Sequence, residues 1–454
     1  MSNWRVGVEH VVAITGLTHE GMGVGRIDNR VVFVPQAIPG DQVRLRLVHV
    51  KERLAYGELL RVVEPSPQRR APSCPHALLC GGCQLQHMDY AAQLRWKRQQ
   101  VVDALERLGG LEVEVLATLG MADPYHYRNK AQLPLGRQGG QLVMGFFQRG
   151  SHDIVDLHTC EIQHALITKL ALAVKRAAGE LGIEPYDEVR HSGVLRHAVI
   201  RVSFAQGKLM LILVTRTREL PHSAELIARL TREIPELVSV VHNINPRVTN
   251  VILGRETQVL WGEEHLLDAV GHLRYAISPL SFFQVNPVQT RVLYDLVRQN
   301  LRLTGAETVL DLYCGAGTIG LYVAAQAGQV IGVESVSAAV EDARRNAELN
   351  GIANAEFHVG RAEEELPKLI QKHTAIDAAI VDPPRKGCDA AVLRALSAAG
   401  VPRLVYVSCN PSTLARDLSQ LAGLGYRLGP VQPVDMFPWT RHVECVVLMS
   451  KVEK

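Results

Sequence analysis

Two residues near the C-terminus have the types and the setting for covalent catalysis. Cys409 lies just after the apolar run RLVYV and before Asn410-Pro411, so we expect it at the carboxyl end of a strand. A thiolate in that position can act as a nucleophile. Glu444 lies within the apolar run HVECVVLM, where burial would raise the pKa of its carboxyl and suit it to act as a general base.

The residue pattern alone leaves alternatives open for both side chains. A lone cysteine is commonly a small apolar core residue, and Glu444 can equally occupy a solvated edge of a strand. A base and a thiol in one site would suit covalent catalysis in which a thiolate adds to the substrate and a carboxylate then removes a proton. Cys314, Cys388 and Cys445 are assigned to structure.

Unusual residues follow further predicted strands and outline one pocket. They are the runs DLYCGAGT (311–318), DPPRKG (382–387) and SCNP (408–411), together with Glu334. Gly315 and Gly317 allow the backbone to turn tightly beside a ligand, and the Glu334 carboxylate can accept hydrogen bonds from ribose hydroxyls. GAGTIG also fits a dinucleotide-binding loop, so a nicotinamide dehydrogenase is the rival interpretation. Asp311 near the loop suits a cationic sulfonium better, which favours S-adenosylmethionine.

The residue after DPP separates classes of methyltransferase. Enzymes that methylate exocyclic amines commonly place an aromatic ring there to stack on the base, whereas this chain has Arg385. A guanidinium suits a phosphate or a carbonyl oxygen.

Cys74, Cys80 and Cys83 form a separate cluster of thiols. A tetrahedral site needs four ligands, and the spacing leaves the fourth unassigned. Four thiolates would suit either zinc or an iron–sulfur cluster, so the pattern does not choose between them.

The elements that would position these residues change character along the chain. The pattern of residues 11–63 predicts short strands of a small barrel, with EGMGVG as a turn. The run SPQRRAPSCP predicts a linker. A helix is expected over 90–108 and strands at LRHAVIRVSF and KLMLILVT. Asn286 and Pro287 begin a further helix. Beyond it, strands alternate with helices, which predicts a parallel doubly wound α/β sheet.

Composition sets mild limits on function. The chain has 454 residues, 47% of them hydrophobic, and a formal net charge of +3, which permits a polyanionic partner without requiring one. No apolar run reaches the roughly 20 residues that span a bilayer. The first residues lack the apolar run of a signal peptide, so we expect a cytoplasmic protein with no membrane partner.

Taken together, several motifs in order resemble the RNA uracil-C5 methyltransferases that carry an N-terminal TRAM domain. The motifs are the three clustered cysteines, SFFQVNP, DLYCGAGT, DPPRKGC, SCNP and HVE. The resemblance implies that Cys409 is the nucleophile and Glu444 the base, and that Cys160 completes a [4Fe-4S] cluster with Cys74, Cys80 and Cys83. It also implies contacts to S-adenosyl-L-methionine. The residues concerned are Gln284, Tyr313, Glu334 and Asp382.

The resemblance also implies an architecture and a substrate. We expect an OB-like TRAM barrel over 1–65, a mixed α+β iron–sulfur domain over 66–276, and a class I, Rossmann-like methyltransferase domain over 277–454. Part of 93–122 is a candidate for packing on the last of these. The expected partner is RNA, with 23S rRNA favoured over tRNA, and the expected state is a monomer. The alternative of a different class is a non-catalytic RNA-binding protein with a redox-sensing cluster.

Overall fold

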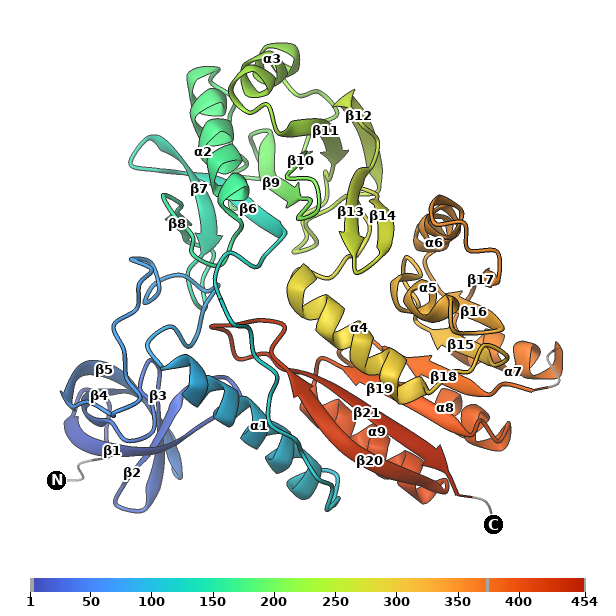
Figure 1. Ribbon diagram of the computed structural model, residues 1–454. Helices are drawn as coiled ribbons and strands as arrows, with labels where there is room; N and C mark the ends of the chain where they lie inside the picture. Colours follow the sequence, from blue (N-terminus) through green and yellow to red (C-terminus); the bar gives the residue numbers. More distant parts are fainter. Residues whose placement is uncertain (1–3, 373–374, 453–454) are drawn as a thin grey trace.

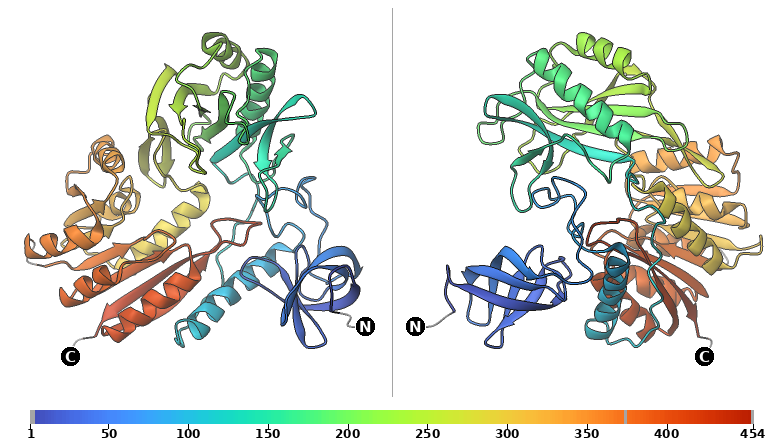
Figure 2. Two further views of the ribbon diagram at one scale, coloured as in Figure 1. Left: turned by 180° about the vertical axis from the view of Figure 1, so that it is seen from behind. Right: turned by 60° about the vertical axis from the view of Figure 1, so that its left-hand side comes forward.

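The computed structural model describes residues 4–372 and 375–452, so the outermost ends of the expected first and last domains lie outside it. The described chain forms a barrel, a central sheet and a C-terminal sheet, which Figures 1 and 2 show as three lobes around a loop-rich junction. Within the described ranges, no helix is long and apolar enough to cross a membrane.

The N-terminal lobe is a closed barrel in the order β1-β2-β3-β5-β4. Its strands are β1 (Glu9–Leu17), β2 (Gly23–Ile27), β3 (Arg30–Val34), β4 (Gln42–Val50) and β5 (Leu54–Glu64). Buried residues such as Val32 and Leu45 alternate with half-buried or exposed ones, as expected for strands with one buried face. The expected turn at EGMGVG is partly wrong, because Gly23 and Gly25 lie inside β2. A Cβ on Gly25 would lie 2.5 Å from a methyl of Val12, so only glycine fits there.

The central sheet has the order β12-β11-β10-β9-β6-β7-β8. Its strands are β6 (Lys130–Gln138), β7 (Gln141–Phe147), β8 (Ile154–Asp156), β9 (Leu195–Val202), β10 (Leu209–Thr215), β11 (Leu237–Ile244) and β12 (Glu256–Gly262). Helices α2 (Ala165–Glu180) and α3 (Ser223–Glu233) belong to the same lobe. Strands β9 and β10 are buried along their whole length, as in a sheet covered on both faces.

The central and C-terminal lobes share a hydrophobic core. The hairpin of β13 (Leu266–Val270) and β14 (Leu273–Ile277) and helix α4 (Pro287–Leu301) lie between the two sheets. One buried cluster joins Val199 and Ile212 of the central sheet to Leu293 of α4 and Val309 of the C-terminal sheet. As predicted, α4 begins at Pro287, and the Asn286 side chain accepts a hydrogen bond from Gln289 N.

The C-terminal sheet has the order β17-β16-β15-β18-β19-β21-β20. Its strands are β15 (Thr308–Leu312), β16 (Gln329–Glu334), β17 (Ala355–Val359), β18 (Ala378–Val381), β19 (Arg403–Ser408), β20 (Tyr426–Val434) and β21 (Glu444–Lys451). The helices between them are α5 (Thr318–Ala324), α6 (Ser337–Leu349), α7 (Ala362–Lys372), α8 (Ala390–Ala398) and α9 (Pro411–Gly423). This α/β arrangement agrees with the expected class I methyltransferase fold.

The parallel alternation stops at the last two strands. Strand β21 runs antiparallel to β19 and to β20, because a loop rather than a crossover helix joins β20 to β21. The periodicity of the sequence does not reveal β17, α7 or β20. In β20, Gly429 and Pro433 interrupt the alternation of apolar residues by which a strand is predicted.

A helix from early in the chain completes the catalytic lobe. Helix α1 (Tyr90–Arg107) packs against α9, and its residues Val101 and Leu105 belong to the core cluster of the C-terminal sheet. The segment after α1 then runs beside β20, where Leu116 N donates to Val431 O and Leu119 N donates to Pro433 O. Part of the stretch 93–122 therefore packs on the C-terminal lobe.

Candidate active site and cysteine cavity

The candidate catalytic residues meet at the carboxyl ends of neighbouring strands. Strand β18 is paired with β15 and β19, so Asp382 after β18 and Cys409 after β19 lie at the same edge of the sheet. Glu444, the first residue of β21, lies at that edge as well, because β21 runs antiparallel to β19. Three side chains far apart in the sequence are thus brought into one corner.

Burial and neighbouring carboxylates in this corner favour the protonated, neutral forms of Cys409, Asp382 and Glu444. Burial raises the pKa of the Cys409 thiol to about 11, Glu444 and Asp382 add to the effect, and Arg385 opposes it. Burial also raises the pKa of Asp382 to about 7. Glu444 is 5% exposed, and burial, reinforced by Asp382, raises its pKa well above the usual range of a glutamate. Incoming positive charge would therefore favour ionisation of these groups.

The loop after β15 is held by two carboxylates. Asp311 Oδ2 accepts a hydrogen bond from Gly320 N at 2.9 Å, whereas Asp311 Oδ1 is buried without a hydrogen-bond partner. Burial raises the pKa of Asp311 to about 7, with Asp382 and Glu334 contributing. Glu334 Oε2 accepts from Gly315 N at 3.2 Å, and Glu334 Oε1 accepts from Val336 N at 2.9 Å.

The backbone of this loop needs special residues. Gly317 has a φ of +74°, and a Cβ there would lie 2.9 Å from the ring of Phe357. Tyr313 has a φ of +63° although it carries a side chain. A conformation of this kind is costly and is found mainly at functional sites. Its half-buried ring lies beside Cys388, whose Sγ is 3.8 Å from the Tyr313 hydroxyl.

Gln284 reaches the region from a different element. It lies in the loop before α4, where Asn129 Nδ2 donates to Gln284 O at 3.0 Å and Asn129 N donates to Val285 O at 2.9 Å. On the other side, Asn286 Nδ2 donates to Met436 O at 3.0 Å. The half-buried Gln284 is therefore held between the central sheet and the loop that precedes Glu444.

A cleft of about 770 Å³ opens onto Cys409. Its walls come from the barrel, from α1 and from the corner that holds Cys409. The charged residues among its lining are Glu20, Arg95, Asp103, Arg107, Arg385 and Arg441. Arginines outnumber acids here, which suits an anionic chain. Arg95 could not be recognised from the sequence, because periodicity marks it only as part of the polar face of α1.

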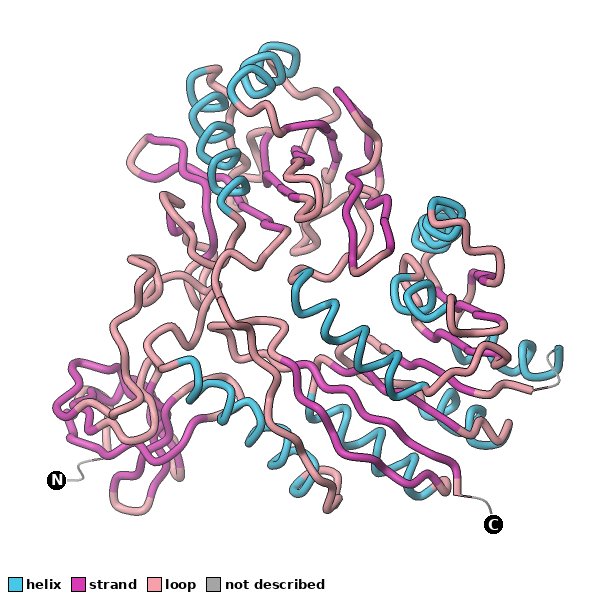
Figure 3. The backbone as a smooth tube through the Cα atoms, viewed as in Figure 1, coloured by secondary structure: helices cyan, strands magenta, loops and turns pink. Residues whose placement is uncertain are grey.

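The four candidate cluster ligands line one smaller cavity of about 110 Å³. Cys74, Cys80 and Cys83 come from the loop-rich segment between the barrel and α1, drawn in pink in Figure 3, and Cys160 comes from the loop after β8. Gly82 N donates to Cys80 Sγ at 3.3 Å, and Gln86 Nε2 donates to Cys83 Sγ at 3.5 Å.

The cavity is apolar enough to keep its thiols neutral. Burial raises the pKa of Cys160 to about 11, and it raises the pKa of the other three as well. Neighbouring cysteines contribute to the rise of the pKa at Cys80, Cys83 and Cys160. Across the residues that the structure describes, no three His, Cys, Asp or Glu side chains are arranged to hold a single metal ion.

The fold and this site define a class of protein. A class I sheet with a glycine loop and acidic residues at its strand ends, preceded by a small β-barrel, is the architecture of a methyltransferase with an added RNA-binding domain.

Comparison with known proteins gives the family. Residues 89–452 match the model of the tRNA (uracil-5-)-methyltransferase family, and residues 3–60 match the TRAM domain. The chain therefore belongs to the tRNA (uracil-5-)-methyltransferase family. It is an S-adenosylmethionine-dependent enzyme that acts on RNA, so the interpretations as a dehydrogenase and as a non-catalytic binding protein are wrong.

Relatives match over nearly the whole chain. An uncharacterised RNA methyltransferase of Halalkalibacterium halodurans is 50% identical over 97% of this chain and 96% of its own length. An uncharacterised RNA methyltransferase of Clostridium tetani is 47% identical over 96% of this chain and 95% of its own length. Among solved structures, the tRNA (uracil-54, C5)-methyltransferase of Pyrococcus abyssi, in complex with S-adenosyl-L-homocysteine, has a TM-score of 0.77 and 29% identity, covering 97% of this chain and 100% of that one.

Proposed function

We propose that this enzyme methylates C5 of a uridine in 23S rRNA through a covalent adduct between Cys409 and C6 of the base. The observation that carries the proposal is the corner in which Asp382, Cys409 and Glu444 lie at the ends of paired strands, close enough for the two carboxylates to raise the pKa of the Cys409 thiol. A nucleophile and a base in one site are what substitution at C5 needs.

The steps follow from the chemistry of uracil. The Cys409 thiolate forms a bond to C6, and the electrons of the C5–C6 double bond move towards the C4 carbonyl oxygen, which leaves C5 nucleophilic. When bound, S-adenosylmethionine would supply the methyl group that C5 takes up and would leave as S-adenosylhomocysteine. Glu444 then removes the C5 proton, the double bond re-forms, and the bond between C6 and Cys409 Sγ breaks.

The local charges support this order of events. The free enzyme keeps Cys409 largely as a thiol because burial raises its pKa to about 11. Arg385 lies close enough to lower that pKa, and a cationic cofactor would act in the same direction. The nucleophile is therefore formed mainly when cofactor and substrate are in place, which limits reaction of the free enzyme with other electrophiles.

Four residues are proposed to hold the cofactor. Glu334 ends β16, where its carboxylate can accept from ribose hydroxyls, and Tyr313 offers a ring for the adenine. Asp382 and Gln284 offer polar groups for the amino acid part. The unpartnered Asp311 Oδ1 beside this loop also fits a cationic ligand.

We propose that Cys74, Cys80, Cys83 and Cys160 hold a [4Fe-4S] cluster. Support comes from the cavity that all four line and from the N–H groups directed at two of the sulfurs, because such donors stabilise thiolate ligands. Four protein ligands leave no iron open for substrate, so the cluster would act as a structural crosslink between the linker and the central domain. Iron and sulfide analysis of anaerobically reconstituted protein tests this proposal, and zinc bound without sulfide would contradict it.

The identity of the RNA is tested directly. Total RNA from cells that lack the gene, and from complemented cells, is analysed for 5-methyluridine in 23S rRNA and in tRNA. We expect one or more sites in 23S rRNA to lose the methyl group and regain it on complementation. Loss confined to tRNA would favour the second candidate, which the tRNA substrate of the Pyrococcus abyssi enzyme suggests. Loss from neither RNA would contradict the proposal.

The covalent step has its own test. Glu444→Gln should still allow attack by Cys409 and methyl transfer, but the C5 proton would remain. A protein–RNA adduct that carries the new methyl group should therefore accumulate and survive denaturing electrophoresis, and Cys409→Ala in the same chain should remove it. Normal turnover by Glu444→Gln would show that another group is the base.

A further inference from the structure

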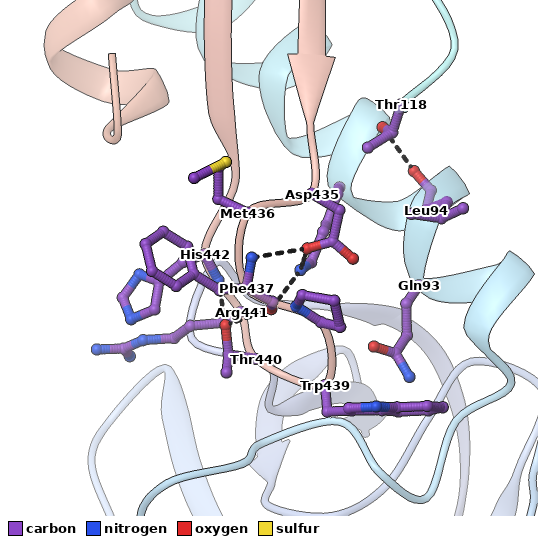
Figure 4. A network of polar contacts seen from close by, with 12 residues as sticks. Gln93, Leu94, Thr118, Asp435, Met436, Phe437, Trp439, Thr440, Arg441 and His442 are labelled. Carbon is purple, nitrogen blue, oxygen red and sulfur yellow. Dashed lines mark hydrogen bonds and ion pairs between the residues drawn. The ribbon is translucent and has the colours of Figure 1, made fainter. Parts of the chain in front are cut away.

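The loop 435–443 leads directly into the proposed base. It joins β20 to β21, and Val434 at the end of β20 is paired with Glu444 at the start of β21. Asp435 is therefore the first residue beyond the pair that contains Glu444. Figure 4 shows Asp435 at this end of the loop, Trp439 at its tip, and Arg441 and His442 on its returning arm.

A buried ion pair fixes the first turn of this loop. Lys97 Nζ of α1 donates to Asp435 Oδ1 at 2.6 Å and to Phe437 O at 3.0 Å. Asp435 also accepts hydrogen bonds from Tyr90 Oη at 2.9 Å and from Phe437 N at 3.2 Å. The side chains of Lys97 and Asp435 are both fully buried, although 338 residues separate them in the chain.

Stability alone is a poor explanation for this pair. Removing two charges from water costs about as much as their attraction returns, and apolar residues of similar volume often stabilise a core equally well. What the pair adds is geometry: one ammonium group binds a side chain and a backbone carbonyl of the same loop. It sets the direction in which the chain leaves β20.

The rest of the loop is anchored independently of Lys97. Trp439 O accepts hydrogen bonds from Gln84 N and Leu85 N, both at 3.0 Å, and Tyr127 Oη donates to Pro438 O at 2.9 Å. Loss of Lys97 would therefore release the end of the loop beside Glu444 while its tip stays in place. The nucleophile would be affected less, because Cys409 is carried by β19 and α9.

We propose that Lys97 is a positioning residue for Glu444: by holding Asp435 and Phe437 it fixes the register at which β21 presents the carboxylate to the C5 proton. This inference rests on the proposed function of Glu444 as the base. A displacement of about 1 Å from a reacting group can reduce a rate by up to about 100-fold. The step affected is removal of the C5 proton, after the covalent adduct has formed.

The test uses Lys97→Met in the full-length, reconstituted protein. We expect kcat to fall by about 10-fold to 100-fold with little change in KM for RNA, and a methylated protein–RNA adduct to accumulate above the wild-type level. A lower kcat without any adduct would overturn the proposal, because a merely structural defect slows every step. Unchanged turnover would overturn it as well.

Two further variants keep the result interpretable. Lys97→Met combined with Asp435→Asn removes both charges but keeps a side-chain acceptor for Phe437 N, so it should fold even where Lys97→Met leaves a carboxylate unpaired. It should still accumulate adduct, and its failure to do so would count against the proposal. Leu105→Ala, in the same helix and 1% exposed, weakens the packing of α1 and should give no adduct.

Glu444→Gln separates this inference from the function on which it rests. If Glu444→Gln traps RNA and Lys97→Met does not, only the positioning role fails. If Glu444→Gln traps no RNA and turns over normally, the assignment of the base fails, and the role of Lys97 fails with it.

Discussion

The proposed catalytic corner and the cysteine cavity both bury groups that ionise, yet they are built in different ways. In the corner, Asp382, Cys409 and Glu444 lie at the ends of paired strands of one sheet. In the cavity, the thiols lie on loops that are joined to the rest of the protein by isolated bridges, such as that between Cys80 and Gln148. Strand ends are fixed by ladders of backbone hydrogen bonds, whereas loops have few such constraints.

This difference predicts where a bound group contributes to folding. The sheet positions the catalytic corner before any ligand arrives, so the cofactor should bind a preformed site. The four thiols lie on loops that no ladder of backbone hydrogen bonds holds in place. A group bound in their cavity should therefore stabilise the fold. Variants in the corner should therefore change activity, and variants in the cavity should change stability.

The largest expected effect is in the corner. Cys409→Ala should reduce methylation by roughly 10⁴-fold or more, because the covalent route is lost, while binding of RNA and of cofactor stays within a few fold. Single-turnover methylation and filter binding measure the two quantities. A thermal unfolding curve that matches wild type would show that the corner is preformed. Turnover within tenfold of wild type would contradict the role of Cys409.

A cavity variant should behave in the opposite way. Cys83→Ala in the reconstituted protein should lose iron and lower the free energy of unfolding by about 2–5 kcal/mol, because ligand binding is part of the folding energy. Affinity for S-adenosylhomocysteine should remain. The control is the metal-free wild type, which should unfold within about 1 kcal/mol of metal-free Cys83→Ala. If wild type and Cys83→Ala have equal free energies of unfolding after reconstitution, the expected difference between the corner and the cavity is contradicted.

A pH titration examines the electrostatics of the corner. The pKa of Asp382 is about 7, so the fraction ionised rises between pH 6 and pH 8. If the ionised form binds the cationic cofactor, affinity for S-adenosylmethionine should rise by about tenfold over that range. Asp382→Asn should bind weakly with a flat profile. Asp311 titrates in the same range, so a residual slope in Asp382→Asn would assign part of the effect to it.

The same shift has a consequence for the free protein with a definite sign. The folded state keeps a proton on Asp382 that the unfolded chain releases near pH 4, so this carboxyl favours folding below that pH. Its contribution should be lost as the pH rises from about 4 to about 7. Chemical unfolding at several pH values, compared between wild type and Asp382→Asn, measures that difference.

The smallest effect concerns a surface contact between lobes. Arg441 lies 3.3 Å from Glu20 of the barrel, and both side chains are more than one-third exposed. Glu20→Gln should change the free energy of unfolding by less than about 1 kcal/mol, and added salt should reduce even that difference. Urea unfolding at two salt concentrations measures it. A larger effect would show that the barrel is held to the loop 435–443 mainly by charge.

Local rules explain how much of this protein can be predicted from its sequence. The barrel strands, the helix that begins at Pro287 and the glycine loop after β15 all follow from short-range patterns of apolar, capping and turn residues. Because parallel strands collect their carboxyl ends at one edge, the same patterns placed Asp382 and Cys409 near each other. The residue types at those ends left alternatives open, and the identity of the chemistry came from the resemblance of the ordered motifs to a known family.

Only the tertiary structure decided which distant segments meet. No periodicity reveals that β21 turns back beside β19, that Cys160 shares a cavity with Cys74, or that Lys97 reaches Asp435 across 338 residues. Such contacts depend on how whole elements pack, and each partner taken alone fits several other environments. The sequence determined which groups are available for chemistry, and the packing of α1 and of the last two strands determined which of them face one another.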